Sequence, residues 1–193
     1  MKKIEFVYEE ILQQTADGNR RLTQSQLSKK LGLSLSMVSL AIRPLRRMGA
    51  VEVKPRGLKV SDPKKVLLYW ASIRNVQKDI VYSTRAEMSV ADIEKNMPHG
   101  IVFTAYSAYR MRFGDAPADY SEVYVYGDAE EVRKRFPPSM NTPNIFVLKA
   151  REAGRQAETA GNPRMFVDLW NLGTWYAKDF LKALEVKLGG VLE

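Results

Sequence analysis

The chain has 193 residues, of which 45% are hydrophobic, so it is long enough to bury the core of one or two globular domains. It carries 30 Lys and Arg against 22 Asp and Glu, which gives a net charge of +8. The absence of cysteine excludes disulfide bonds, thiolate zinc sites and cysteine nucleophiles.

The positive charge is concentrated near the N-terminus. Residues 1–60 hold 12 Lys and Arg against 5 Asp and Glu, whereas residues 61–193 hold 18 against 17. A basic surface that serves only solubility is one explanation. Charge gathered in one third of a chain more strongly favours contact with phosphate groups.

Residues 3–16 predict a first helix, which ends at the turn formed by residues 17–19. Lys2 and Lys3 are followed by acidic and amide side chains where a signal peptide would be apolar. No run approaches 18 apolar residues, the length needed to span a membrane. We therefore expect a cytoplasmic protein that has no membrane partner.

A second, short helix is predicted to begin after Thr23. The Thr23 hydroxyl and the Gln26 side chain are spaced as a capping box. Leu27 and Leu31 lie four residues apart and share one face of the helix. Gly32 follows directly, as expected where a helix ends in a left-handed residue.

A third helix follows, with Ser34 or Ser36 as its cap and Gly49 at its end. Its inward stripe is formed by apolar side chains at spacings of four and three: Val38, Ile42 and Leu45. Pro44 lies inside the helix, where proline costs about 3 kcal/mol. We expect a kink at Pro44 on the exposed side that leaves residues 36–43 unaffected.

A basic hairpin completes this region. Val51 and Val53 alternate with charged neighbours as strand residues do, and Leu58 and Val60 repeat the pattern. Residues 54–57 form the turn between the two strands. This order of helices and hairpin is typical of a winged helix-turn-helix. In such domains the second helix of the helix-turn-helix pair enters the major groove of DNA.

The winged helix-turn-helix is expected to occupy residues 1–61, and residues 62–78 are expected to connect it to a second domain. Asp62 and Pro63 form a helix-start signal. The following residues, 63–74, are strongly apolar on one side and predict a helix.

Residues 79–193 alternate strands and helices, so the predicted fold class is α+β, with a C-terminal α/β domain. Strands are predicted at residues 101–103, 123–126, 145–148 and 165–169. Helices are predicted after Ser89 and at residues 104–113, 129–136 and 174–188. Residues 150–163 are polar and are expected to form a loop or a helix fragment.

The sequence offers few groups for catalysis. It has no phosphate-binding GxxxxGK[ST] loop, GxGxxG turn, HExxH helix or GxSxG elbow. The single histidine, His99, is expected in a loop. Asp115 and Asp128 follow glycine, which favours turn or cap roles. We expect no catalytic residue, no metal and no cofactor.

An enzyme remains the main alternative. Asp128 and Asp168 could converge on Mg²⁺, as in nucleotidyl or phosphoryl transfer. However, the tight Asp-x-Asp pair used by nucleotidyltransferases is absent. Tyrosines are frequent between residues 82 and 126 and could stack on bases near Arg110 and Arg112. Their spacing more often indicates a half-buried core.

Three segments carry a resemblance to a known family: TQSQLSKKLGLSLSMVSLAIRPLRRMGAV, TAYSAYRMRFGDAPADYSEVYVYGD and MFVDLWN. Their order resembles the AbiEi-type antitoxins and related archaeal and bacterial transcriptional regulators. The resemblance implies an N-terminal winged helix that binds its own promoter and a C-terminal domain with antitoxin activity. It also implies a nucleotidyltransferase-like toxin as a partner.

We therefore predict a sequence-specific DNA-binding regulator that acts as a homodimer on double-stranded DNA. The residues expected to face base edges are Ser36, Met37, Ser39, Leu40 and Arg43, with Arg43 contacting guanine. The residues expected to contact phosphates are Lys29, Lys30, Arg46 and Arg47. On the hairpin, Lys54 and Arg56 are expected to reach the DNA backbone or the adjoining minor groove. A third hypothesis is that the winged helix docks an acidic protein partner instead of DNA.

Overall fold

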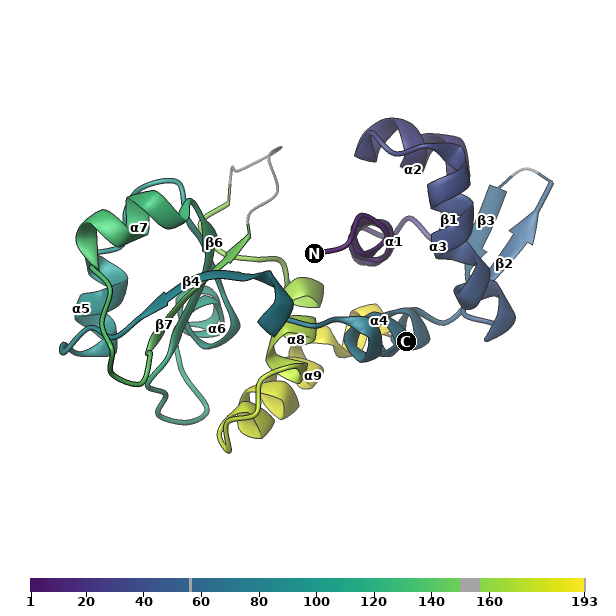
Figure 1. The fold of residues 1–193 in the computed structure, drawn as a ribbon. Coiled ribbons are helices and arrows are strands. Elements are labelled where there is room, and N and C mark those ends of the chain that lie inside the picture. Colours follow the sequence, from purple (N-terminus) through teal and green to yellow (C-terminus); the bar gives the residue numbers. More distant parts are fainter. Residues whose placement is uncertain (56, 150–156, 193) are drawn as a thin grey trace. The chain divides into compact units, whose positions relative to one another are not determined.

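The computed structural model describes residues 1–55, 57–149 and 157–192. The chain divides into two compact units. The first comprises residues 1–74 and 185–193, and the second comprises residues 75–184. The mixture of helices and sheets confirms the predicted α+β class, which is visible in Figure 1.

The first unit contains a helix-turn-helix followed by a hairpin. Its helices are α1 (Glu5–Ala16), α2 (Gln24–Leu31), α3 (Leu35–Arg47) and α4 (Pro63–Ile73). Its strands are β1 (Arg21–Leu22), β2 (Val51–Lys54) and β3 (Gly57–Val60). They form an antiparallel sheet in the order β1-β3-β2. The two-residue strand β1 was not predicted, because so short a run carries no alternation.

Local sequence signals explain the helix boundaries in this unit. Thr23 and Gln26 form the predicted capping box at the start of α2, and Gly32 ends that helix with a left-handed φ of 64°. Ser34, one of the two expected caps, starts α3. This helix runs without a break through Pro44 to Arg47, and Pro44 is half-buried.

The helix α4 belongs to the first unit. We expected residues 62–78 to be a separate connector, but residues up to Arg74 are grouped with the winged helix-turn-helix. The reason is that Val66, Leu67 and Trp70 are buried, and α4 packs on α1. An amphipathic helix joins the unit that covers its apolar face.

The second unit is built on a four-stranded sheet in the order β4-β7-β6-β5. The strands are β4 (Ile80–Thr84), β5 (Val102–Thr104), β6 (Val123–Gly127) and β7 (Ile145–Lys149). β6 and β7 are parallel, and the other two pairs are antiparallel. A short 3₁₀ helix, η1 (Gln77–Asp79), precedes β4.

Helices cover both faces of this sheet. The helices that begin in this unit are α5 (Val90–Lys95), α6 (Ala105–Phe113), α7 (Ala129–Arg135), α8 (Asn162–Trp170) and α9 (Ala177–Leu192). Figure 1 shows α5 and α7 on one side of the sheet, and α6 and α8 on the other. The last residues of α9, from Glu185 onward, are grouped with the first unit.

One predicted strand is wrong. Residues 165–169 lie in α8, a helix that begins with Asn162 and Pro163. The apolar character of these residues suggested a strand, but a fully buried helix segment gives the same run, and the structure shows all five residues buried. The loop or helix fragment expected at 150–163 falls partly outside the described residues, and its last two residues begin α8.

Candidate nucleic-acid interface

The helix α3 presents two contrasting faces. Its inward face is completed by buried apolar side chains: Val38, Ala41, Ile42 and Leu45. At its start, the Ser34 hydroxyl accepts a hydrogen bond from the Met37 backbone N–H, at 3.3 Å. Because the inward face is fully packed, the orientation of the outward face is fixed by the core.

Four of the five residues predicted to face base edges are exposed, namely Ser36, Ser39, Leu40 and Arg43, while Met37 is half-buried. Ser36, Leu40, Arg43 and Arg47 are separated by four, three and four residues. Positions at this spacing lie along one side of a helix. We call these four residues the outer stripe of α3.

Of the side chains predicted to contact phosphate, Lys29, Arg46 and Arg47 are exposed. Lys30 forms an ion pair with Glu10, with 2.6 Å between Nζ and Oε1. Lys54 forms one with Glu52 of the same strand, at 3.2 Å. Arg56 lies outside the described residues.

The hairpin of β2 and β3 is held against β1 by a close backbone approach. Gly57 has a φ of 140°, and a methyl group at its Cα would collide with the carbonyl oxygen of Leu22. Only glycine satisfies both conditions. Arg21 of β1 is paired with Lys59 of β3, so the hairpin adds its charges to those of the helix-turn-helix.

Sequence reasoning missed two basic residues near the hairpin. Arg21, Lys54 and Lys59 line a groove of about 450 Å³ together with Thr23 and Gln26 of the α2 start. Lys59 could have been found, since it lies between the inward-facing Leu58 and Val60 and must point outward. Arg21 carried no signal, because the strand β1 was not predicted.

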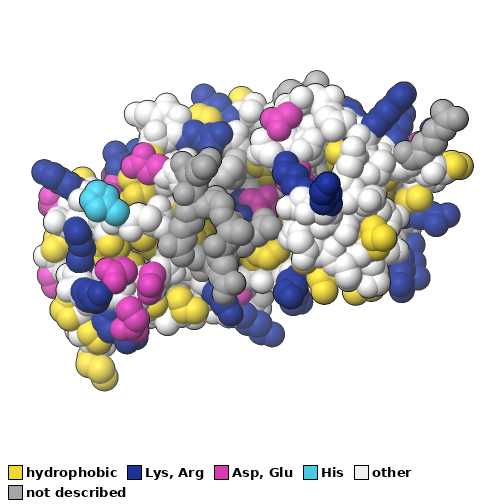
Figure 2. Space-filling model, turned by 90° about the horizontal axis from the view of Figure 1, so that it is seen from above, with side chains coloured by type: hydrophobic (Ala, Val, Ile, Leu, Met, Phe, Trp, Pro, Cys, Tyr) yellow, Lys and Arg dark blue, Asp and Glu magenta, His cyan; other side chains and the backbone are white. Residues whose placement is uncertain are grey.

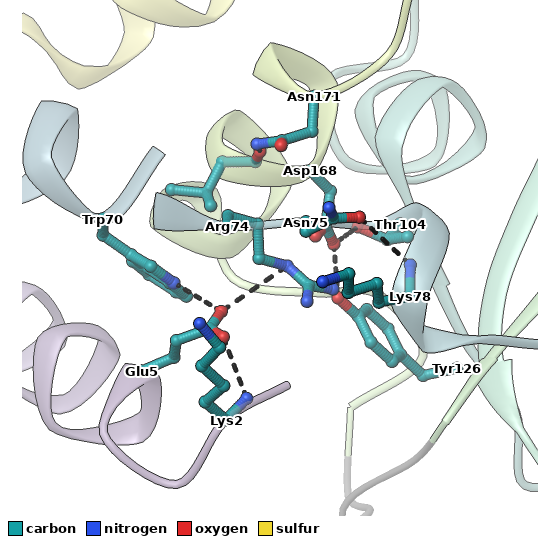
Figure 3. A network of polar contacts seen from close by, with 11 residues as sticks. Lys2, Glu5, Trp70, Arg74, Asn75, Lys78, Thr104, Tyr126, Asp168 and Asn171 are labelled. Carbon is teal, nitrogen blue, oxygen red and sulfur yellow. Dashed lines mark hydrogen bonds and ion pairs between the residues drawn. The ribbon is translucent and has the colours of Figure 1, made fainter. Parts of the chain in front are cut away.

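A buried polar cluster fixes α4 against α1 (Figure 3). The Glu5 carboxylate accepts a hydrogen bond from the Trp70 indole N–H at 3.1 Å and lies 3.7 Å from Nε of Arg74. Its other oxygen accepts from the backbone N–H of Lys2 at 2.9 Å. The side chains of Glu5 and Arg74 are at most 2% exposed, so the pair is structural.

The comparison with protein families agrees with this geometry. Residues 9–52 match the family model described as winged helix-turn-helix DNA-binding. The first unit therefore carries a winged helix-turn-helix. Neither a curated protein nor a solved structure shows a significant match to the chain. The matched segment contains α2 and α3 complete, and its description as a DNA-binding domain supports DNA as a partner.

Two of the carboxylates considered for catalysis, Asp168 and Asp128, have structural partners. Asp168 is 1% exposed and accepts hydrogen bonds from the hydroxyls of Thr104, at 2.8 Å, and Tyr126, at 2.6 Å (Figure 3). Asp128 caps α7 through a hydrogen bond from the Glu130 N–H, as its position after glycine predicted. Asp115 is exposed.

The remaining group considered for catalysis or metal binding is the single histidine of the chain. His99 is exposed, and Figure 2 shows it at the surface. No group of three or more His, Asp or Glu residues able to hold a metal occurs within residues 1–55, 57–149 and 157–192. In the same part of the chain, no helix combines the length and the apolar character that a membrane span requires.

The tyrosines of the second unit belong to its core. Tyr106, Tyr109 and Tyr124 are at most 4% exposed, and the ring centroids of Tyr106 and Phe180 lie 4.9 Å apart. Tyr120 is half-buried, and burial raises its pKa to about 12. A buried ring has no free face for a base, so the predicted core role fits these residues better than base stacking.

Proposed function

We propose that the protein is a non-enzymatic, sequence-specific DNA-binding regulator that acts as a homodimer. The observation that carries the proposal is the outer stripe of α3, which projects from a packed helix-turn-helix and is flanked by basic residues. The stripe supplies hydroxyl and guanidinium donors for base edges. The flanking Lys29, Arg46 and Lys54 supply charge for phosphates.

Arg43 is the main specificity residue in this proposal. Its guanidinium has the fork geometry that pairs with the O6 and N7 atoms of guanine. Such a contact discriminates against other bases by about 1–3 kcal/mol. In a symmetric dimer two copies of α3 would read half-sites about one or two helical turns apart.

The experiment is selection of bound duplexes from a random pool by the full chain, followed by titration at several salt concentrations. If about six phosphates are neutralised, log affinity falls with log salt at a slope near −5. Replacing both Lys54 and Arg56 by alanine should flatten the slope by about two. Arg133→Ala with Lys134→Ala, an exposed basic pair on α7, is the matched control and leaves the slope unchanged.

Two results would contradict the proposal. One is that no duplex is retained at low ionic strength. The other is that the affinity does not depend on salt, since phosphate contacts release counterions. Binding of an acidic protein with no binding of DNA would instead favour the docking hypothesis for the winged helix.

We further propose that the regulator is the antitoxin of a toxin–antitoxin pair, acts in the cytoplasm and represses its own operon. The support is the resemblance of residues 23–51 and 104–128 to AbiEi-type antitoxins. The third segment of that resemblance, residues 165–171, lies in the last part of α8 and its C-cap and does not form the expected strand, so it adds no support.

Co-expression with the product of the adjacent gene tests the antitoxin role. The expected result is that this product stops growth alone and that the chain restores growth. An adjacent product that is harmless alone would contradict the antitoxin role and leave the DNA-binding proposal intact.

A further inference from the structure

An exposed leucine lies within the outer stripe of α3. Leu40 is 51% exposed, and its neighbours along the stripe are Ser36 on one side and Arg43 on the other. Leu40 is not part of the core, because four other side chains form the buried face of α3. Of the exposed large apolar side chains described for the first unit, three lie on α3 or the hairpin: Leu35, Leu40 and Val53.

Leu40 and Leu35 do not share one side of the helix. Five residues separate them, which corresponds to a rotation of about 140° around the helix axis. Leu40 shares its side with Arg43, the proposed guanine contact, whereas Leu35 lies at the flank. Leu40 is therefore the exposed large apolar side chain that shares the outer stripe with Arg43.

The major groove offers one apolar group to such a side chain. Base edges present hydrogen-bond donors and acceptors there, and thymine adds its C5-methyl group. A leucine cannot form hydrogen bonds through its side chain, so the methyl group is its complementary contact. Resting on the proposed DNA-binding function, we infer that Leu40 reads the C5-methyl group of a thymine.

The spacing along α3 locates this thymine relative to the guanine. Leu40 and Arg43 are separated by a rise of about 4.5 Å along the helix axis. Successive base pairs are about 3.4 Å apart. With α3 lying along the groove, the thymine therefore lies within about two base pairs of the guanine contacted by Arg43.

Deoxyuridine substitution tests the inference, because uracil keeps the pairing and the O4 acceptor of thymine and lacks only the methyl group. The strongest duplex selected from a random pool is resynthesised with one thymine at a time replaced by deoxyuridine. At one position per half-site, near a guanine, binding by the full chain should weaken by about fourfold, the value of one buried methyl group. For Leu40→Ala the thymine and deoxyuridine duplexes should bind equally.

Two further variants sharpen the test. Leu40→Met keeps an apolar side chain and should keep part of the preference for thymine. Val81→Ala removes a side chain of similar exposure, 48%, from β4 of the second unit and should keep the full preference.

The outcomes separate the inference from the function on which it rests. If duplexes are bound but no deoxyuridine substitution weakens binding, the reading by Leu40 is wrong and the DNA-binding function stands. The same conclusion follows if Leu40→Ala keeps the preference for thymine. If no duplex is retained, the DNA-binding function is wrong and the inference falls with it.

Discussion

The carboxylate of Glu52 lies 3.2 Å from the ammonium nitrogen of Lys54 on the hairpin strand β2. The hydrogen bond and charge of Lys54 lower the pKa of Glu52. At neutral pH an ordinary glutamate is already ionised. A phosphate group must therefore compete with Glu52 for Lys54.

Glu52→Gln should strengthen DNA binding, because it removes a negative charge that competes with phosphate. The expected gain is about two- to fivefold in affinity at low salt, which is the range of one exposed ion pair. Titration of the selected duplex measures it. Glu130→Gln, which breaks the similar exposed pair with Arg133 on α7, should leave the affinity unchanged. Weaker binding by Glu52→Gln would show that the hairpin does not approach phosphate.

Arg43→Lys should reduce sequence discrimination while keeping much of the affinity for non-specific DNA. Lysine keeps the positive charge but lacks the planar fork that pairs with guanine. The ratio of affinities for the selected and a scrambled duplex should fall, by an amount that corresponds to a loss of about 1–3 kcal/mol of binding free energy. Arg46→Lys, in the last turn of the same helix, should preserve the ratio, because a phosphate contact needs charge alone. Equal ratios for both variants would reject Arg43 as a base contact.

Gly57→Ala should destabilise the protein more than an alanine substitution at a positive-φ glycine that has free space beside it. Gly49 also has a positive φ, 73°, but nothing lies within 4 Å of an added methyl group there. Gly49→Ala should therefore cost only the left-handed penalty of about 1–2 kcal/mol. Gly57→Ala adds the collision with the Leu22 carbonyl and should cost more. Denaturant unfolding measures both, and equal losses would contradict the close packing of β3 on β1.

The sequence predicted most of the first unit because its boundaries depend on local chemistry. The capping box at Thr23, the left-handed Gly32 and the cap at Ser34 act within a few residues of one another. The exposure of Arg43 followed from the spacing of the inward stripe. These features need no knowledge of distant parts of the chain.

Some features that the sequence could not predict depend on residues far apart in the chain. The hydroxyls that hold Asp168 are 42 and 64 residues away. In a continuous buried run, periodicity does not separate strand from helix, so residues 165–169 were assigned incorrectly. The ion pairs of Lys30 and Lys54 also depend on side-chain placement, and they change which cations are available to phosphate.

Removing the buried Glu5 carboxylate should be costly. Glu5→Ala leaves the Arg74 guanidinium and the Trp70 indole without this acceptor in a site that is nearly closed to water. Breaking a buried pair in this way costs about 3–5 kcal/mol. Glu87→Ala breaks an exposed pair with Arg85 and should cost about 1 kcal/mol or less. Similar free energies of unfolding for the two variants would show that the Glu5 cluster does not stabilise the first unit.

The last prediction concerns Glu122, a half-buried residue next to β6. Burial raises the pKa of this carboxyl above its ordinary value, although the hydrogen bond from the Tyr124 hydroxyl opposes the shift. The folded protein therefore holds the Glu122 proton to higher pH than the unfolded chain does. The contribution of Glu122 to stability is complete below the unfolded pKa and is lost as pH rises through the folded pKa.

Glu122→Gln stays neutral at every pH and keeps an oxygen that accepts from Tyr124. The variant should therefore be more stable than the parent at pH 7, and the difference should disappear below about pH 4. Denaturant unfolding at the two pH values measures this. Glu87→Gln, at an exposed position, should show no comparable change in stability difference between the two pH values. A loss of stability in Glu122→Gln at pH 7 would mean that its charged form is stabilised in the fold, against the direction that burial requires.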